Sequence, residues 1–208
     1  MNVIGQAAVP TLQTQRLGTL DNIRADVVRA VLDRNQEIKA EDLPFSVKLG
    51  AFLRLTTQVV VAYRVLHGLR GFPIPVLRQA LQLVVGIYQR VLTLLTGVII
   101  DTQAEIGPGL LVHTPYAVFV GGTRIGANCT VQSGVLIPTG SRGVGNNVYF
   151  GAGAKLLADT KVGNNVVIVA NSLVLTDVPD NTTIVGVPAR IKLRGGRPQR
   201  FKKVVNTE

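Results

Sequence analysis

The sequence predicts an α+β protein in which an N-terminal helical domain is followed by a parallel β-helix. Two observations support this prediction: apolar residues recur at helical spacing in the first half of the chain, and from residue 100 onward they recur every six residues. A period of six matches neither a helix nor an alternating strand. It is typical of hexapeptide repeats, in which three short strands form one triangular coil. We therefore expect a helical domain over 1–97, a β-helix over 98–191 and a basic tail over 192–208.

Length and composition fit a globular chain with one sizeable core. The chain has 208 residues, 47% of them hydrophobic and 16% charged, which is too apolar for a wholly disordered chain. Lys and Arg outnumber Asp and Glu by 22 to 12, a formal net charge of +10. This balance favours anionic partners. Nucleic acid is not predicted as a partner, because zinc-finger spacing and RNP-like aromatic patterns are absent.

The cysteine and histidine content restricts the chemistry. Cys129 is the only cysteine, so an internal disulfide and a CxxC metal site are both excluded. His67 and His113 are the only histidines, and nothing clusters with them to suggest a metal, so we predict none. A chain without disulfides and without a recognisable secretory signal is predicted to be cytoplasmic.

Three helices are predicted before the repeats. The first spans 20–40, with Asp21 as a plausible N-cap, and the second runs from about 45 to 69. The third runs from about 76 to 96, and we expect it to bury a large face rather than to cross a membrane. Arginines flank the apolar faces of the helices within 52–95. These faces could therefore pack on the β-helix or on another subunit, or they could contact a membrane surface.

Thirteen apolar positions continue the six-residue series, with two one-residue slips. We expect these side chains to point into the prism and to stack in about four coils, each advancing about 4.8 Å. Asn and Gly recur at the corners, because they tolerate the left-handed backbone best. The apolar positions are Ile100, Ile106, Val112, Val118 or Phe119, Ile125, Val131, Ile137, Val144, Phe150, Leu156, Val162, Ile168 and Val174, and the recurring asparagines are Asn128, Asn147, Asn165 and Asn171.

Three stretches carry a resemblance to a known family. They are IGPGLLVH with VFVGGTRIG in 106–126, VGNNVYFGAGAKLL with VGNNVVIVANSLV in 144–174, and DVPDNTTIVGVPARI in 177–191. Together they resemble the hexapeptide acyltransferases, and most closely the serine acetyltransferase family, which includes many acetyltransferases that act on saccharides. The helix segment AYRVLHGLR at 62–70 is also similar to this family, so the resemblance covers about 60–193.

The resemblance implies a left-handed β-helix that forms a trimer or a pair of trimers, with acyl-CoA between neighbouring prisms. It implies acetyl transfer from acetyl-CoA to a hydroxyl group, with His113 as the general base. A hydroxyl is too weakly acidic to attack a thioester unaided, and a neutral imidazole can take its proton. His67 matches a structural histidine of the family's helical domain.

Four positions match residues that contact the cofactor in this family, and a fifth is a further candidate. Ala152 and Ala170, and with them Gly153, match small residues along the pantetheine arm, where a larger side chain would keep the arm from the prism wall. Arg190 matches the basic residue that ends the Pro-Ala-Arg motif and is placed for the CoA phosphates. Lys155 is a second candidate for a phosphate.

The sequence departs from serine acetyltransferases near the base. Val112 replaces an acidic residue before the base, and 135–145 is a shorter loop that lacks the family's second histidine. The acidic residue that orients the base falls at Ile99, and Asp101, two positions away, is the candidate to replace it.

These departures favour a sugar hydroxyl over L-serine as the acceptor. Tyr116 and Arg142 are predicted to flank the acceptor pocket. The leading interpretation is thus an acetyl-CoA-dependent O-acetyltransferase acting on a saccharide, as in polysaccharide biosynthesis. Serine O-acetyltransferase of cysteine biosynthesis is the alternative among enzymes, and a catalytically silent assembly subunit is the alternative from another class.

Overall fold

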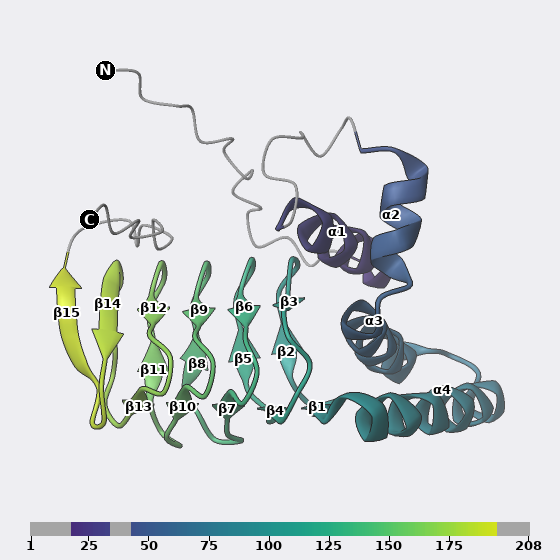
Figure 1. Cartoon of the computed structure of the whole chain (residues 1–208). Coiled ribbons are helices and arrows are strands. Elements are labelled where there is room, and N and C mark those ends of the chain that lie inside the picture. Colours follow the sequence, from purple (N-terminus) through teal and green to yellow (C-terminus); the bar gives the residue numbers. More distant parts are fainter. Residues whose placement is uncertain (1–17, 34–42, 195–208) are drawn as a thin grey trace.

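Helices gather at one end of a solenoid of short strands (Figure 1). The structure is a computed structural model that describes residues 18–33 and 43–194. The predicted basic tail beyond Arg194 and the end of the predicted first helix lie outside the described residues. The helical elements are α1 (Thr19–Leu32), α2 (Phe45–Phe52), α3 (Leu55–Gly68), the 3₁₀ turn η2 (Leu69–Gly71) and α4 (Pro75–Thr96).

The segment predicted as one helix over about 45–69 is two helices. α2 ends at Phe52, and Arg54 has an extended backbone with ψ 137° before α3 begins. The Arg54 side chain donates to the carbonyl of Ala30 in α1 at 3.0 Å. The break therefore lets three helices pack together. α4 ends as predicted, with Gly97 in the left-handed conformation at φ 65°.

Fifteen strands are described, and most have two or three residues. They run as three parallel ladders along the solenoid, and only the last strand is antiparallel. Sheet A contains β1 (Val98–Ile100), β4 (Val118–Val120), β7 (Leu136–Ile137), β10 (Lys155–Leu156) and β13 (Leu173–Val174). Sheet B contains β2 (Glu105–Ile106), β5 (Arg124–Ile125), β8 (Gly143–Val144) and β11 (Lys161–Val162). Sheet C contains β3 (Leu111–Val112), β6 (Thr130–Val131), β9 (Tyr149–Phe150), β12 (Val167–Ile168), β14 (Thr182–Val185) and β15 (Arg190–Arg194).

The predicted hexapeptide prism is confirmed, with the fold of a left-handed β-helix. Each of the thirteen apolar positions is buried, with Val118 rather than Phe119 facing inward. The ladder partner of Ile100 is Val120, however, and not Val118, because the turn at 113–117 is longer than the later turns of the same edge. The prism has about five coils rather than four, because Val178 pairs with Val162 and β14 continues sheet C.

Asparagine holds the corners of the prism as predicted. Asn128, Asn147, Asn165 and Asn171 all have φ between 54° and 57°, the left-handed region that Asn tolerates better than most residues. Side-chain amides also bond from coil to coil: the Asn147 amide donates to Asn165 at 3.0 Å, and the Asn165 amide donates to Asn181 at 2.9 Å. These contacts lock successive coils in register.

The helical domain and the prism share one continuous core. Val59, Val60 and Tyr63 of α3 belong to the same buried cluster as the inward-facing strand residues. The Tyr63 hydroxyl donates to the carbonyl of Ala104 at 2.7 Å, and burial raises its pKa to about 12. Cys129 lies inside the prism, with its thiol donating to the carbonyl of Gly145 at 3.3 Å.

The outer side of α4 is apolar and exposed in the single chain. Only Leu92 and Thr96 of this helix are buried, so the large buried face predicted here is not formed within one chain. The helix packs on α3 and β1 along one side only. We call the opposite side the α4 outer face; its exposed members are Val76, Leu77, Leu81, Leu83, Val84, Ile87, Val91, Leu94 and Leu95.

Within 18–33 and 43–194, no single helix has both the length and the apolar composition that a membrane crossing requires. The bent pair Phe45–Phe52 and Leu55–Gly71, with 80° between its two halves, meets this requirement jointly.

Candidate active site

His113 lies on the outside of the prism at the end of β3. Its backbone N–H donates to the carbonyl of Val131 at 3.0 Å, so the ladder fixes its backbone. Val112 points into the core and is buried. The next side chain along a strand points the opposite way, and the His113 side chain is accordingly 47% exposed. A rigid wall thus presents an imidazole to solvent.

Both nitrogens of His113 have polar partners. Nε2 lies 3.3 Å from Oδ2 of Asp33, which belongs to the C-cap of α1. Nδ1 lies 3.1 Å from the hydroxyl oxygen of Thr114, which in turn lies 3.4 Å from the side-chain oxygen of Gln132. The aspartate was missed by sequence reasoning, because it is about 80 positions away in the chain.

A buried ion pair holds α1 against the coil that leads to His113. Asp26 pairs with Arg64 of α3 at 2.9 Å. The Oδ1 atom of Asp26 accepts the backbone N–H groups of Gly109 and Leu110, each at 2.8 Å. Arg64 also donates to the carbonyls of Ile106 and Gly107. Burial raises the pKa of the Asp26 carboxyl, while Arg64 and the two N–H groups act in the opposite direction.

The predicted base and three of the predicted cofactor positions lie along one edge of the prism. This edge joins sheet C to sheet A, and we call it the His113 edge; it comprises 113–117, 132–135, 151–154 and 169–172. Backbone bonds connect its coils: Gly134 N–H donates to Tyr116, Gly153 N–H to Ser133, and Asn171 N–H to Ala152, each at 2.8 Å.

Among the predicted cofactor positions, only Gly153 is also required by the backbone conformation of the fold. Gly153 has φ 72°, and a Cβ there would lie 2.2 Å from Oδ1 of Asn171, so glycine is needed for the fold alone. Ala152 and Ala170 lie at the surface of the edge. Lys155 is the exposed first residue of β10, directly after the edge, and Arg190 is exposed at the start of β15, where it pairs with Val185.

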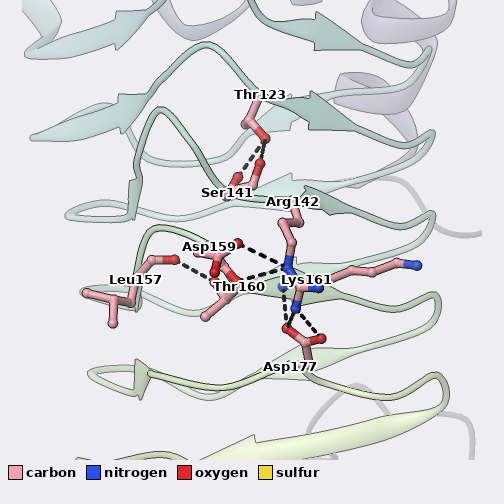
Figure 2. A network of polar contacts seen from close by, with 8 residues as sticks. All are labelled: Thr123, Ser141, Arg142, Leu157, Asp159, Thr160, Lys161 and Asp177. Carbon is pink, nitrogen blue, oxygen red and sulfur yellow. Dashed lines mark hydrogen bonds and ion pairs between the residues drawn. The ribbon is translucent and has the colours of Figure 1, made fainter.

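Two predicted site residues lie along a different edge, which joins sheet A to sheet B. We call it the Arg142 edge; it comprises 101–104, 121–123, 138–142, 157–160 and 175–177. Figure 2 shows Arg142 there, paired with Asp177 and also bonded to the carbonyl of Asp159 at 3.0 Å. This pairing lowers the pKa of Asp177. Within one chain, Arg142 therefore does not flank His113, whereas Tyr116 does lie on the His113 edge and is 67% exposed.

Asp101 also lies on the Arg142 edge. Its carboxylate accepts the backbone N–H of Gln103 at 2.8 Å and so closes its own turn. The expectation that Asp101 orients His113 is not met within one chain, because the two residues follow strands of different sheets. His67 is a packing residue as predicted: its Nδ1 lies 3.2 Å from the carbonyl of Thr102.

The fold and the repeats define a hexapeptide-repeat transferase. Residues 143–176 match the family model described as Bacterial transferase hexapeptide (six repeats). The serine acetyltransferase of Synechococcus elongatus is 37% identical over 147 residues, which are 67% of this chain and 57% of that enzyme. The serine acetyltransferase of Staphylococcus xylosus is 34% identical over 154 residues, 69% of this chain and 71% of that enzyme.

Solved structures agree with these relatives. A serine acetyltransferase in complex with CoA is similar over 83% of this chain and 69% of that one, with a TM-score of 0.62 and 29% identity. The Neisseria gonorrhoeae enzyme in complex with serine is similar over 83% of this chain and 68% of that one, with a TM-score of 0.62 and 28% identity. The chain belongs to the serine acetyltransferase family, and hence to the acyl-CoA-dependent acetyltransferases.

Proposed function

We propose that the protein transfers the acetyl group of acetyl-CoA to the hydroxyl of L-serine, with His113 as general base. One observation carries this proposal: a solvent-facing imidazole and the surface alanines predicted to contact CoA lie along the same edge of a rigid prism. Family membership supports the acyl donor, and the similar enzymes favour L-serine over the saccharide acceptor expected from the sequence.

The reaction needs one proton acceptor beside the thioester carbonyl. The neutral imidazole of His113 takes the proton of the acceptor hydroxyl while the hydroxyl oxygen attacks the carbonyl carbon. The tetrahedral intermediate then collapses, the carbon–sulfur bond breaks, and the CoA thiolate recovers the proton from the imidazolium. Because the backbone N–H of His113 is fixed in a ladder, the imidazole loses little freedom when the substrates bind.

The His113 edge has a suitable length for the pantetheine arm. Four coil steps separate His113 from the segment at 186–190, which is about 19 Å at about 4.8 Å per coil. Arg190 is exposed at that far end, and exposed Lys155 lies between. Two cations along the path suit the phosphates of CoA, since Arg in particular offers paired N–H donors to phosphate.

A saccharide hydroxyl is the second candidate acceptor. Val112 and the loop at 135–145 lack the acidic and histidine side chains that the family carries there, so groups implied to hold an amino acid are missing. Tyr116, exposed on the His113 edge, offers an aromatic face and a hydroxyl to a sugar ring.

The first test is release of CoA thiol from acetyl-CoA, with L-serine and with a panel of sugars and nucleotide sugars. We expect turnover with L-serine and a loss of at least about 100-fold in kcat for His113→Asn. His67→Asn is the matched control, since it removes the other histidine of the chain and should keep kcat within about twofold.

Each result separates the candidates. Turnover with a sugar alone would replace L-serine by the saccharide acceptor. Full activity of His113→Asn would remove the proposed base. If nothing turns over and the protein does not bind CoA in calorimetry, the enzyme proposal falls and a silent assembly role replaces it.

We also propose that the chain works as a trimer or a pair of trimers. The α4 outer face supports this, because contiguous apolar surface of this extent is rare on soluble monomers. A neighbouring copy would cover this face, and in a trimer an adjacent prism would supply the second wall of the groove for acyl-CoA.

A further inference from the structure

We propose that Asp33 is the positioning residue of His113: its carboxylate accepts the Nε2–H of the imidazole and leaves Nδ1 as the atom that takes the acceptor's proton. This inference rests on the proposed function, in which His113 is the base. It differs from the sequence expectation, in which a residue of the repeats, Asp101, had this task. The helical domain would thus complete the active site of the prism.

The distance between Asp33 and His113 and the burial of Asp33 are those of a hydrogen-bonded pair. Asp33 Oδ2 and His113 Nε2 are 3.3 Å apart, and the Asp33 side chain is only 14% exposed. A carboxylate withdrawn from water interacts more strongly with a neighbouring N–H than one in bulk solvent. His113 keeps 47% of its side chain exposed, so the imidazole remains accessible to substrates while one of its nitrogens is held.

The helix that carries Asp33 is fixed relative to the base. About two turns earlier, Asp26 is bonded to the N–H groups of Gly109 and Leu110 on the coil that leads into His113. Arg64 bonds the same carboxylate and the carbonyls of Ile106 and Gly107. The position of Asp33 is therefore set by a buried network, not by the exposed surface of the helix.

The position of Asp33 in its helix is a second, independent observation. Asp33 is the C-cap of α1, where the helix dipole disfavours a negative charge. The last turn instead carries the favourable cation Arg29. The helix dipole therefore gives no reason for a carboxylate at this position, whereas the imidazole 3.3 Å away does.

The contacts select one neutral tautomer. A carboxylate only accepts hydrogen bonds, so the Nε2 atom must carry the proton. Nδ1 is then unprotonated, so the one hydrogen of the Thr114 hydroxyl turns to Nδ1, 3.1 Å away, in place of the longer 3.4 Å contact with Gln132. In catalysis the acceptor's hydroxyl takes the place of this Thr114 hydroxyl at Nδ1. When the imidazole becomes an imidazolium, the Asp33 charge stabilises it.

The kinetic test compares three variants of the full chain in the thiol-release assay. Asp33→Asn should lower kcat by about 10- to 100-fold, the usual cost of removing a partner that orients a histidine, and should leave the KM for acetyl-CoA within about twofold. Asp33→Glu should recover part of kcat. Asp21→Asn, an exposed aspartate at the other end of the same helix, is the control and should match the wild type.

Two kinetic results would overturn the proposal. One is a kcat of Asp33→Asn within twofold of wild type with every acceptor. The other is a rise in the KM for L-serine with unchanged kcat, because that pattern would make Asp33 a binding group for the acceptor's ammonium rather than a partner of the base.

A spectroscopic test does not depend on turnover. The chain has only two histidines, so the imidazole ¹⁵N shifts can be assigned by comparison with His67→Asn. We expect the Nε2–H tautomer for neutral His113, and a shift toward a tautomer mixture in Asp33→Asn. An Nδ1–H tautomer that is the same in both proteins would overturn the proposal. If wild type shows no turnover but the tautomer responds to Asp33, the proposed function fails while the positioning contact stands.

Discussion

The buried carboxylate of Asp26 links the helical domain to the first coil of the prism. Asp26 is 2% exposed and accepts bonds from Arg64 and from two backbone N–H groups of the first coil. Its side chain falls on the apolar stripe of α1, beside Val27 and Ala30. A charged group in an apolar stripe is costly unless it is paired, and the fold supplies every one of its partners from another element.

Removing both members of this pair should therefore cost less than the sum of removing each one alone. We expect Asp26→Leu or Arg64→Met alone to lower the free energy of unfolding by about 3–5 kcal/mol, because each leaves an uncompensated buried charge. The double variant should be less destabilised than the sum of the two by about 1–3 kcal/mol.

Urea unfolding of the four proteins would measure this cycle. Asp21→Ala is the control, since its exposed pair with Arg24 at 3.8 Å should contribute under about 1 kcal/mol. Strictly additive losses would contradict the argument.

At the scale of elements, the Arg142 edge is a ladder of polar contacts between coils. Asp177 accepts Arg142 and also the backbone N–H of Lys161 at 3.0 Å, and the Thr123 hydroxyl bonds Ser141 (Figure 2). These contacts link neighbouring coils at corners where short strands leave few backbone bonds. The side chain predicted to bind an acceptor thus stabilises the solenoid.

The pairing with Arg142 implies an acid-side loss of stability. Arg142 holds the pKa of Asp177 below its ordinary 3.8, so the pair stabilises the fold above pH 3.8, and this contribution is lost as the pH falls through the lowered folded-state value. We expect wild type to unfold at slightly higher temperature than Asp177→Asn at pH 5, and the gap to close below about pH 3.8. A gap that widens on acidification in calorimetry would contradict this assignment.

The sequence predicts those parts of the structure whose residues repeat at a fixed spacing, and it does not predict the contacts that occur only once. The thirteen apolar positions and the four corner asparagines repeat in every coil, so the prism could be predicted from spacing alone. The spacing also shows a one-residue slip between Val112 and Ile125, but it does not show that Val120 becomes the ladder partner of Ile100.

Asp33 and His113 meet only because the helical domain folds back on the first coil, and no spacing in the chain encodes that contact. The predicted helix over 20–40 also places Asp33 well before a helix end, whereas in the structure it is the C-cap of α1. The unfavourable position of its charge in the helix dipole is thus visible only in the structure.

At the scale of the whole molecule, one chain leaves its longest helix half covered. The α4 outer face includes Val84 at 65% and Leu94 at 86% exposure, and apolar surface of this extent favours association.

We therefore expect wild type to have a mass three or six times 22.2 kDa in light scattering. Val84→Glu with Leu94→Glu should shift it toward the single-chain mass and lower activity together with assembly. Gln79→Glu introduces one glutamate at an exposed polar position of the same helix and is the control, with Val84→Glu alone as the variant of matched charge. A monomeric wild type that binds vesicles of anionic lipid would assign this face to a membrane surface instead.

The buried thiol has a practical consequence for every assay of this protein. Cys129 is fully enclosed in the prism, and burial raises its pKa to about 12, so at neutral pH almost none of it is the reactive thiolate. It is also the only cysteine of the chain. A disulfide reagent added to the folded enzyme should thus report CoA release with no background from the protein, and a stoichiometric signal without acetyl-CoA would register unfolding.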